Sequence, residues 1–232
     1  MKNKLLLLVS CLLLASGPAF AQVASNDTVI VPEGHKIVVW GIKGNLSAEL
    51  PGKRKLNGQQ VMGFNSGFGA SLGGLVNIYL GKNFYFEPEV ALFYEGHSYN
   101  NVKSVASNSP MVNVGPNIYK LGVRIPVTFG YFINISEKWG LDIFTGPQFS
   151  YAFYGKAKSD DPTVSGNPNL MSVFSGDYAQ RRSDLEWKIG VGFPVERFLI
   201  SLEADLGITN ILKSPYTMRE NRLSLGITYY FE

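Results

Sequence analysis

The chain has 232 residues, with 21 Lys and Arg against 18 Asp and Glu, so its formal net charge is only +3. This near balance argues against a nucleic-acid-binding protein, whose surface would carry a strong excess of basic residues. Charged residues make up 17 % of the chain, below the roughly 25 % that is usual for soluble domains. The composition therefore disfavours an ordinary soluble domain.

Residues 1–21 have the three parts of a secretory signal peptide. Lys2 and Lys4 precede an apolar run over residues 5–14, and the small residues Ala19 and Ala21 follow at the positions that a signal peptidase recognises. The run is too short for a transmembrane helix, which needs about 20 residues. We expect cleavage after Ala21, so that the mature chain begins at Gln22.

The one cysteine of the chain, Cys11, lies inside this leader. The stretch Leu8-Val9-Ser10-Cys11 resembles a lipobox, which would place a lipid on Cys11. The apolar run continues past Cys11, however, and this favours an ordinary leader. We therefore expect a mature chain without cysteine, in which disulfides play no part.

After a polar lead, residues 22–35, the rest of the chain (residues 36–232) alternates apolar side chains with small or polar ones. This period of two is typical of strands with unlike faces. The alternation predicts eight strands, over residues 40–47, 67–80, 84–95, 119–131, 141–153, 184–193, 198–209 and 223–231.

The predicted connections alternate between long and short. Polar loops are expected over residues 49–65, 99–116, 155–183 and 212–218, and tight turns near residues 81–83, 134–138 and 196–197. Long extracellular loops and short periplasmic turns are typical of outer-membrane barrels. An open sheet would leave unpaired backbone groups in lipid, at several kcal/mol each. The pattern predicts an all-β fold: an eight-stranded antiparallel up-and-down transmembrane β-barrel in the outer membrane, with both termini in the periplasm.

Five short motifs in order along the chain carry a resemblance to a known family. The chain resembles the PorT-like outer-membrane β-barrel proteins, small barrels of the OmpA/OmpX type. The resemblance implies the fold and the outer-membrane location, but these motifs do not carry over the role of the PorT member in type IX protein secretion. The motifs are Trp40-Gly-Ile-Lys-Gly-Asn-Leu-Ser47, Phe86-Glu-Pro-Glu-Val-Ala-Leu92, Arg124-Ile-Pro-Val127, Gly207-Ile-Thr-Asn-Ile211 and Asn221-Arg-Leu-Ser-Leu225.

The strand faces that point away from lipid carry many charges. Glu87 with Glu89, or Glu203 with Asp205, could form an acid–base pair. Residues two apart on a strand share a face, however, so a charged lumen produces such pairs automatically. An eight-stranded barrel is just wide enough for its interior to be filled by side chains. We expect an ionic plug rather than a pore, formed by Lys43, Glu87, Glu89, Glu95, Lys120, Arg124, Asp142, Glu186, Lys188, Glu203, Asp205 and Arg222.

His97 is the best candidate for a catalytic side chain, because it lies near the loop-side end of a predicted strand beside Ser98. Neighbours on a strand point to opposite faces, so Ser98 and His97 are poorly placed as a nucleophile and its base. The chain has no His/Cys cluster for zinc, and Asp160-Asp161 lacks the spacing of a calcium loop. We predict no catalytic, cofactor-binding or metal-binding residue and no cofactor.

The longest loop, residues 155–183, is the predicted contact region, because loops held by a rigid frame often carry binding. Its candidate contacts are Met171, Phe174 and Tyr178. The expected function is structural or adhesive, or accessory to protein secretion and envelope assembly. The expected partners are outer-membrane lipid or lipopolysaccharide, the barrel-assembly machinery during insertion, and an extracellular or secretion-system protein. The alternatives are an enzyme that modifies lipid A and a small pore.

Overall fold

The computed structural model describes residues 38–64, 66–81, 83–100, 117–136, 139–158, 171–175, 179–213 and 215–231. The predicted leader and the polar lead lie outside the described residues, so both stay predictions. Nowhere in these described ranges is there a helix with the length and apolar character needed to cross a membrane.

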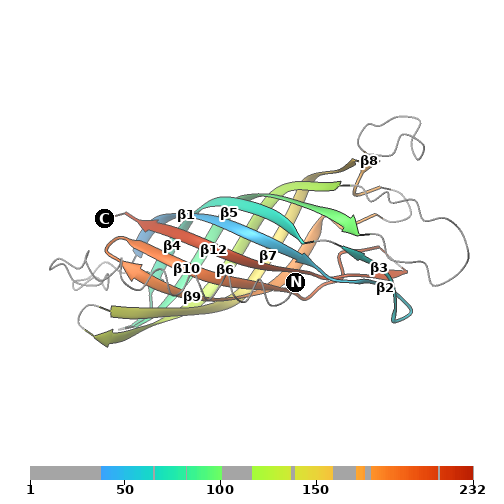
Figure 1. Ribbon diagram of the computed structural model, residues 1–232. Helices are drawn as coiled ribbons and strands as arrows, with labels where there is room; N and C mark the ends of the chain where they lie inside the picture. The colour runs from blue at the N-terminus through green and yellow to red at the C-terminus, as the bar shows by residue number, and fades with distance from the viewer. Residues whose placement is uncertain are drawn as a thin grey trace, which may run out of the picture.

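Eight long strands form a closed antiparallel barrel (Figure 1). Each strand pairs with the next one along the wall, and β12 pairs back onto β1, so the sheet has no open edge. The predicted eight-stranded up-and-down barrel is confirmed. The wall strands are β1 (Val38–Pro51), β4 (Gly67–Tyr79), β5 (Phe84–Asn100), β6 (Asn117–Ser136), β7 (Trp139–Lys158), β9 (Ser183–Val195), β10 (Phe198–Gly207) and β12 (Glu220–Tyr230).

Four short strands lie at one end of the barrel, which we call the loop end; the other end, which carries the tight turns and the C-terminus, is the turn end (Figure 1). They are β2 (Arg54–Leu56), β3 (Gln59–Phe64), β8 (Met171–Ser172) and β11 (Tyr216–Thr217).

These short strands correct the prediction that residues 49–65 are only a polar loop. β2 and β3 form a hairpin through Asn57 and Gly58, whose φ angles of 50° and 83° are typical of the two-residue turns that match strand twist. β3 pairs onto the end of β5, and β11 pairs onto β2. The sheet therefore continues beyond the closed barrel at the loop end.

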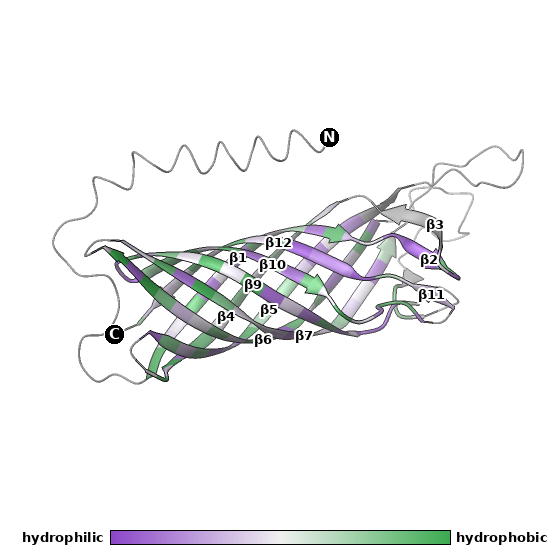
Figure 2. Cartoon of the chain, turned by 90° about the horizontal axis from the view of Figure 1, so that it is seen from below, coloured by the Kyte–Doolittle hydropathy of each residue, from purple (hydrophilic) through white to green (hydrophobic). Residues whose placement is uncertain are grey.

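Hydrophilic and hydrophobic residues alternate along the wall strands (Figure 2), and the two faces of the wall differ in character. Outward side chains are apolar and exposed: Leu72 is 66 % exposed and Trp40 is 63 % exposed. Inward side chains are charged and buried: Glu203 is 1 % exposed. This inversion of a soluble protein is stable only when lipid covers the outside, because apolar surface is excluded from water.

Proline and an inserted residue disturb the ladders at two places. Between β4 and β5 the paired residues stop at Leu75 and Glu89 and resume at Ile78 and Phe86. This gap spans Pro88, which has no N–H to donate to the ladder. Between β6 and β7 the register shifts at Leu121 and Gly122, which inserts one extra residue in β7.

Buried aromatic rings lie over glycines on neighbouring strands. A Cβ on Gly130 would lie 2.0 Å from Tyr85 Cζ, and a Cβ on Gly190 would lie 2.2 Å from Phe144 Cζ. Tyr85 and Gly130 are register partners, as are Phe144 and Gly190. Because glycine has no side chain, the rings can pack directly against the backbone at these points and fit in a narrow lumen.

Candidate functional site

Charged side chains from seven of the eight wall strands, all except β4, meet inside the barrel. All twelve side chains of the predicted ionic plug are buried there, each at most 6 % exposed. Ten of them form ion pairs with one another, and the two that do not are Glu87 and Asp142.

The half of the network nearer the turn end links two lysines through shared carboxylates. Lys43 Nζ lies 2.5 Å from Glu203 Oε1 and 3.7 Å from Glu89 Oε2. Lys188 Nζ lies 2.5 Å from Glu203 Oε2 and 3.1 Å from Asp205 Oδ1. Glu203 therefore bridges two cations that would otherwise repel each other in the lumen.

Arg222 on β12 is the centre of the network. Its Nη1 lies 2.9 Å from Asp205 and 3.1 Å from Glu186. Its Nε donates to Glu49 at 3.0 Å, and its Nη2 lies 3.3 Å from Glu95. The guanidinium fork thus satisfies carboxylates from four other strands at once, which suits its five fixed donors.

Two cations close the network toward the loop end. Arg124 Nη2 lies 2.5 Å from Glu95 Oε2, and its guanidinium lies 4.1 Å from the centre of the Phe93 ring. Lys120 Nζ lies 2.8 Å from Glu95 and 2.7 Å from Glu220. The ion pairs thus run without a break from Lys43 to Glu220 along the lumen.

Two network residues, Glu49 and Glu220, are missing from the sequence prediction. Both are buried, at 3 % and 7 % exposed. Glu49 falls in a segment predicted as a loop, and Glu220 falls between the predicted loop 212–218 and the last predicted strand. Each nevertheless continues the inward alternation of its strand, after Ser47 and before Arg222. Extending the alternation by one step at each strand end would have found them.

The predicted catalytic candidate His97 is buried inside the barrel. Its Nε2 lies 4.0 Å from Glu220 Oε1, and its side chain is 6 % exposed. The imidazole therefore belongs to the loop-end part of the lumen and not to the lipid-facing rim.

The predicted contact Phe174 is buried at the barrel mouth, and its role in partner binding stays a prediction. It is 9 % exposed and packs with Phe93 and Ala152, while the Arg182 guanidinium lies 4.4 Å from its ring centre. The ring fills the space over Gly155, where a Cβ would lie 2.7 Å from Phe174 Cζ. The side chain of Met171 and all of Tyr178 lie outside the described residues.

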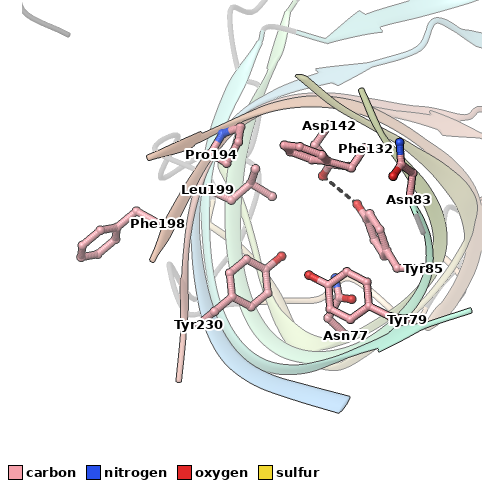
Figure 3. Close-up of a pocket in the computed structure, with 10 residues that line it drawn as sticks. All are labelled: Asn77, Tyr79, Asn83, Tyr85, Phe132, Asp142, Pro194, Phe198, Leu199 and Tyr230. Carbon is pink, nitrogen blue, oxygen red and sulfur yellow. Dashed lines mark hydrogen bonds between the residues drawn. The ribbon is translucent and has the colours of Figure 1, made fainter. Parts of the chain in front are cut away.

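A cavity of about 30 Å³ that is partly open to solvent lies at the turn end (Figure 3). Tyr79, Tyr85, Tyr230, Asn77 and Asp142 line it. The Tyr85 hydroxyl donates to Asp142 Oδ2 at 2.7 Å. The sequence pattern places Tyr79 and Tyr230 on inward faces but does not show that these strand ends meet.

Among the described residues, the exposed charges at the loop end are basic. Within the described ranges, the acidic side chains of that end, Glu49, Glu95, Asp184 and Glu220, are all buried. A set of basic side chains from the same end reaches the surface, and we call this set the basic rim. Its members are Lys53, Lys55, Lys156, Arg181, Arg182, Lys213 and Arg219.

A closed barrel with a lipid-facing outer wall and an ion-paired lumen defines an integral membrane protein that crosses the bilayer with strands. A family model described as an outer membrane protein beta-barrel domain matches residues 20–213. The chain belongs to this family, and the protein is therefore an outer-membrane β-barrel protein. Comparison with curated proteins gave no significant match.

Several solved structures share the fold. Ail, the attachment invasion locus protein of Yersinia pestis, is 16 % identical over 83 % of this chain and 98 % of its own, with a TM-score of 0.40. Neisserial surface protein A is 10 % identical over 83 % of this chain and 97 % of its own, with a TM-score of 0.45. OprG from Pseudomonas aeruginosa is 13 % identical over 86 % of this chain and 98 % of its own, with a TM-score of 0.44. Similarity at this level concerns the fold alone.

Proposed function

We propose that this protein is a non-enzymatic outer-membrane barrel of the structural or adhesive kind that acts through its loop end. In such barrels the long loops are extracellular and the short turns periplasmic. The observation that carries the proposal is the basic rim, because its cations are exposed while the acids of the same end are buried. A role accessory to protein secretion or envelope assembly is the second form of this proposal.

Three cations of the basic rim lie together at the seam between the first and last strands. Lys55 pairs with Thr217 across β2 and β11, and the Gly52 N–H donates to the Arg219 carbonyl at 2.8 Å. Continuing this register places Arg219 opposite Lys53. Like charges on facing positions repel each other, so this cluster is stabilised by an external anion.

The phosphate groups of lipopolysaccharide are the anions that fit this position. The cluster follows directly on the lipid-facing run of β1, which ends at Leu50. A basic side chain near an anionic membrane surface contributes about 1 kcal/mol of attraction. The rim would anchor the barrel among outer-leaflet headgroups while the loops face outward.

The test compares charge reversal with charge conservation. The variant K53E/K55E/R219E should bind purified lipopolysaccharide at least about tenfold more weakly than wild type, because three attractive charges become repulsive. The variant K53R/K55R/R219K should bind as wild type. If the wild-type protein bound dephosphorylated lipopolysaccharide as tightly as intact lipopolysaccharide, the proposal would be contradicted.

The contribution of the long loop requires a deletion that spares the buried part. Removing all of residues 155–183 would also remove Val173 and Phe174, which are buried at the barrel mouth. Removal of residues 159–170 avoids them. We expect a folded barrel that no longer co-purifies with its protein partner after crosslinking of the intact envelope. Unchanged co-purification would assign the contact to another loop.

The enzyme alternative makes a contrary prediction at His97. A lipid-modifying enzyme needs its catalytic group within reach of the acyl chains, whereas His97 faces Glu220 inside the lumen. The variant His97→Ala should leave the lipid A composition of the native envelope unchanged. An altered lipid A profile in this variant would favour the enzyme.

The pore alternative is tested by conductance. Arg222 and its carboxylate partners occupy the lumen, and the fixed charges around them are paired. The barrel in planar bilayers should show no steady single-channel current. Regular ion-selective steps in the wild-type protein would contradict a filled lumen.

A further inference from the structure

Two buried carboxylates at the turn end form no ion pair among the described residues: Asp142, which lines the cavity, and Glu87, which is hydrogen-bonded to the cavity residues Asn77 and Tyr230. Glu87 and Asp142 are 6 % and 2 % exposed. Among the described residues neither has a cationic side chain within 4.0 Å, and the nearby Lys43 forms its ion pairs with Glu203 and Glu89 instead. A buried carboxylate without a cation is costly, so the site favours a positive charge from outside the chain.

The hydrogen bonds of these carboxylates come from neutral donors. Glu87 Oε2 accepts from Asn77 Nδ2 at 2.9 Å and from the Tyr230 hydroxyl at 3.0 Å. Asp142 Oδ2 accepts from Tyr85. These bonds hold both carboxylates in place but supply no positive charge.

Two buried acceptors at the cavity wall receive no hydrogen bond from the described residues. They are Asp142 Oδ1 and Asn77 Oδ1. Both residues line the cavity, together with the side chains of Tyr79, Tyr85 and Tyr230, which point into it (Figure 3). Buried acceptors of this kind are normally satisfied, so they mark where a donor belongs.

We propose that this cavity binds a primary ammonium group. An ammonium supplies the positive charge that these carboxylates lack and three N–H donors, which are enough for the free acceptors Asp142 Oδ1 and Asn77 Oδ1. The surrounding tyrosine rings attract cations through their π faces. The described residues contain no group of three or more His, Cys, Asp or Glu side chains suited to a metal ion, and a quaternary ammonium has no proton to donate. The site lies at the opposite end of the barrel from the basic rim, so it is independent of the proposed function.

Calorimetry on the refolded barrel in detergent micelles tests the proposal with n-propylammonium chloride as the probe. Tetramethylammonium chloride at the same ionic strength separates hydrogen bonding from charge. We expect saturable binding of propylammonium and at least about tenfold weaker binding of tetramethylammonium. No saturable binding of propylammonium, or equal binding of the two cations, would overturn the proposal.

Three variants locate the site. Asp142→Asn keeps an acceptor for Tyr85 but removes the charge and should weaken binding by about tenfold or more. Tyr79→Leu keeps an apolar side chain without a π face and should weaken binding on the order of three- to thirtyfold; it also serves if the Asp142→Asn variant fails to fold. Glu196→Gln, at an exposed turn of the same end, is the control and should bind as wild type. Wild-type binding by the Asp142 and Tyr79 variants would place the ammonium elsewhere and overturn the proposal.

The ammonium could belong to a free amine or to the headgroup of phosphatidylethanolamine. Nanodiscs made with and without this lipid distinguish the two sources. Competition between the lipid and propylammonium would identify the headgroup as the ligand. Undiminished binding of propylammonium in the presence of the lipid would identify a free amine of the periplasm.

Discussion

Arg222 is the side chain whose loss should affect the lumen most. Its guanidinium contacts Glu49, Glu95, Glu186 and Asp205, and every one of these carboxylates is buried. Arg222→Met keeps the volume but leaves these charges with fewer partners. We expect a loss of about 3–5 kcal/mol in the free energy of unfolding, measured by urea titration in lipid vesicles.

The control for this experiment is Arg219→Met, which removes an exposed arginine three positions earlier. A surface substitution of this kind usually changes stability by less than about 0.5 kcal/mol. Equal losses of unfolding free energy in the two variants would mean that the ion pairs of Arg222 do not stabilise the fold.

Glycines on the two faces of the wall should respond differently to an added methyl group. In Gly130→Ala the new Cβ would lie 2.0 Å from Tyr85 Cζ, so the ring would have to move and lose its bond to Asp142. We expect a loss of about 1–3 kcal/mol. Gly44→Ala meets nothing within 4 Å and should be nearly neutral. The reverse order of stabilities would contradict the packing of Tyr85 on Gly130.

At the scale of the element, β10 tests both the facing and the depth of the strands. Leu202 faces outward and is 38 % exposed, and Ile208 follows the strand near the loop end. Leu202→Arg should cost about 2–4 kcal/mol at mid-bilayer, whereas Ile208→Arg should cost about 0–1 kcal/mol near the interface. Folding into vesicles across a urea series measures both. Equal penalties would show that Leu202 is not at mid-bilayer depth.

The strand faces could be predicted from the sequence, but several strand ends could not. Contact with lipid requires apolar residues such as Leu202 to alternate with inward polar residues such as Ser201. This alternation shows which residues of each strand face outward. Beyond the bilayer both faces of a strand contact water, so the alternation of apolar and polar residues ends although the backbone pairing of the strands continues. For this reason Glu49 was assigned to a loop, and the hairpin of β2 and β3 was not predicted. The burial of Phe174 depends on a hollow over Gly155, which no local pattern indicates.

The sequence also did not reveal the cavity at the turn end. Tyr79 and Tyr230 follow the inward alternation, yet they lie on strands separated by most of the chain. Whether their ends reach the same level depends on strand tilt and stagger, which are properties of the closed barrel. The twelve residues of the ionic plug were predictable because a narrow lumen brings every inward charge close to another.

At the scale of the whole molecule, closure should make the barrel resistant to detergent. β1 and β12 are joined over eleven register pairs, from Gly41 and Tyr230 to Pro51 and Glu220. Protein extracted in mild detergent should migrate differently on a denaturing gel before and after boiling. Deletion of residues 226–232 removes part of the joining strand and should abolish this difference. A truncated protein that keeps the difference would mean that closure does not depend on this end of β12.

The position of Arg222 on the last wall strand has a consequence for the order of assembly. Its carboxylate partners lie on β1, β5, β9 and β10, all of which are synthesised before β12. A barrel closed without β12 would confine these negative charges without the cation that joins them. Their mutual repulsion would keep the unfinished sheet open and hydrated until the arginine arrives. The lumen charges would thus disfavour closure of a sheet that lacks β12.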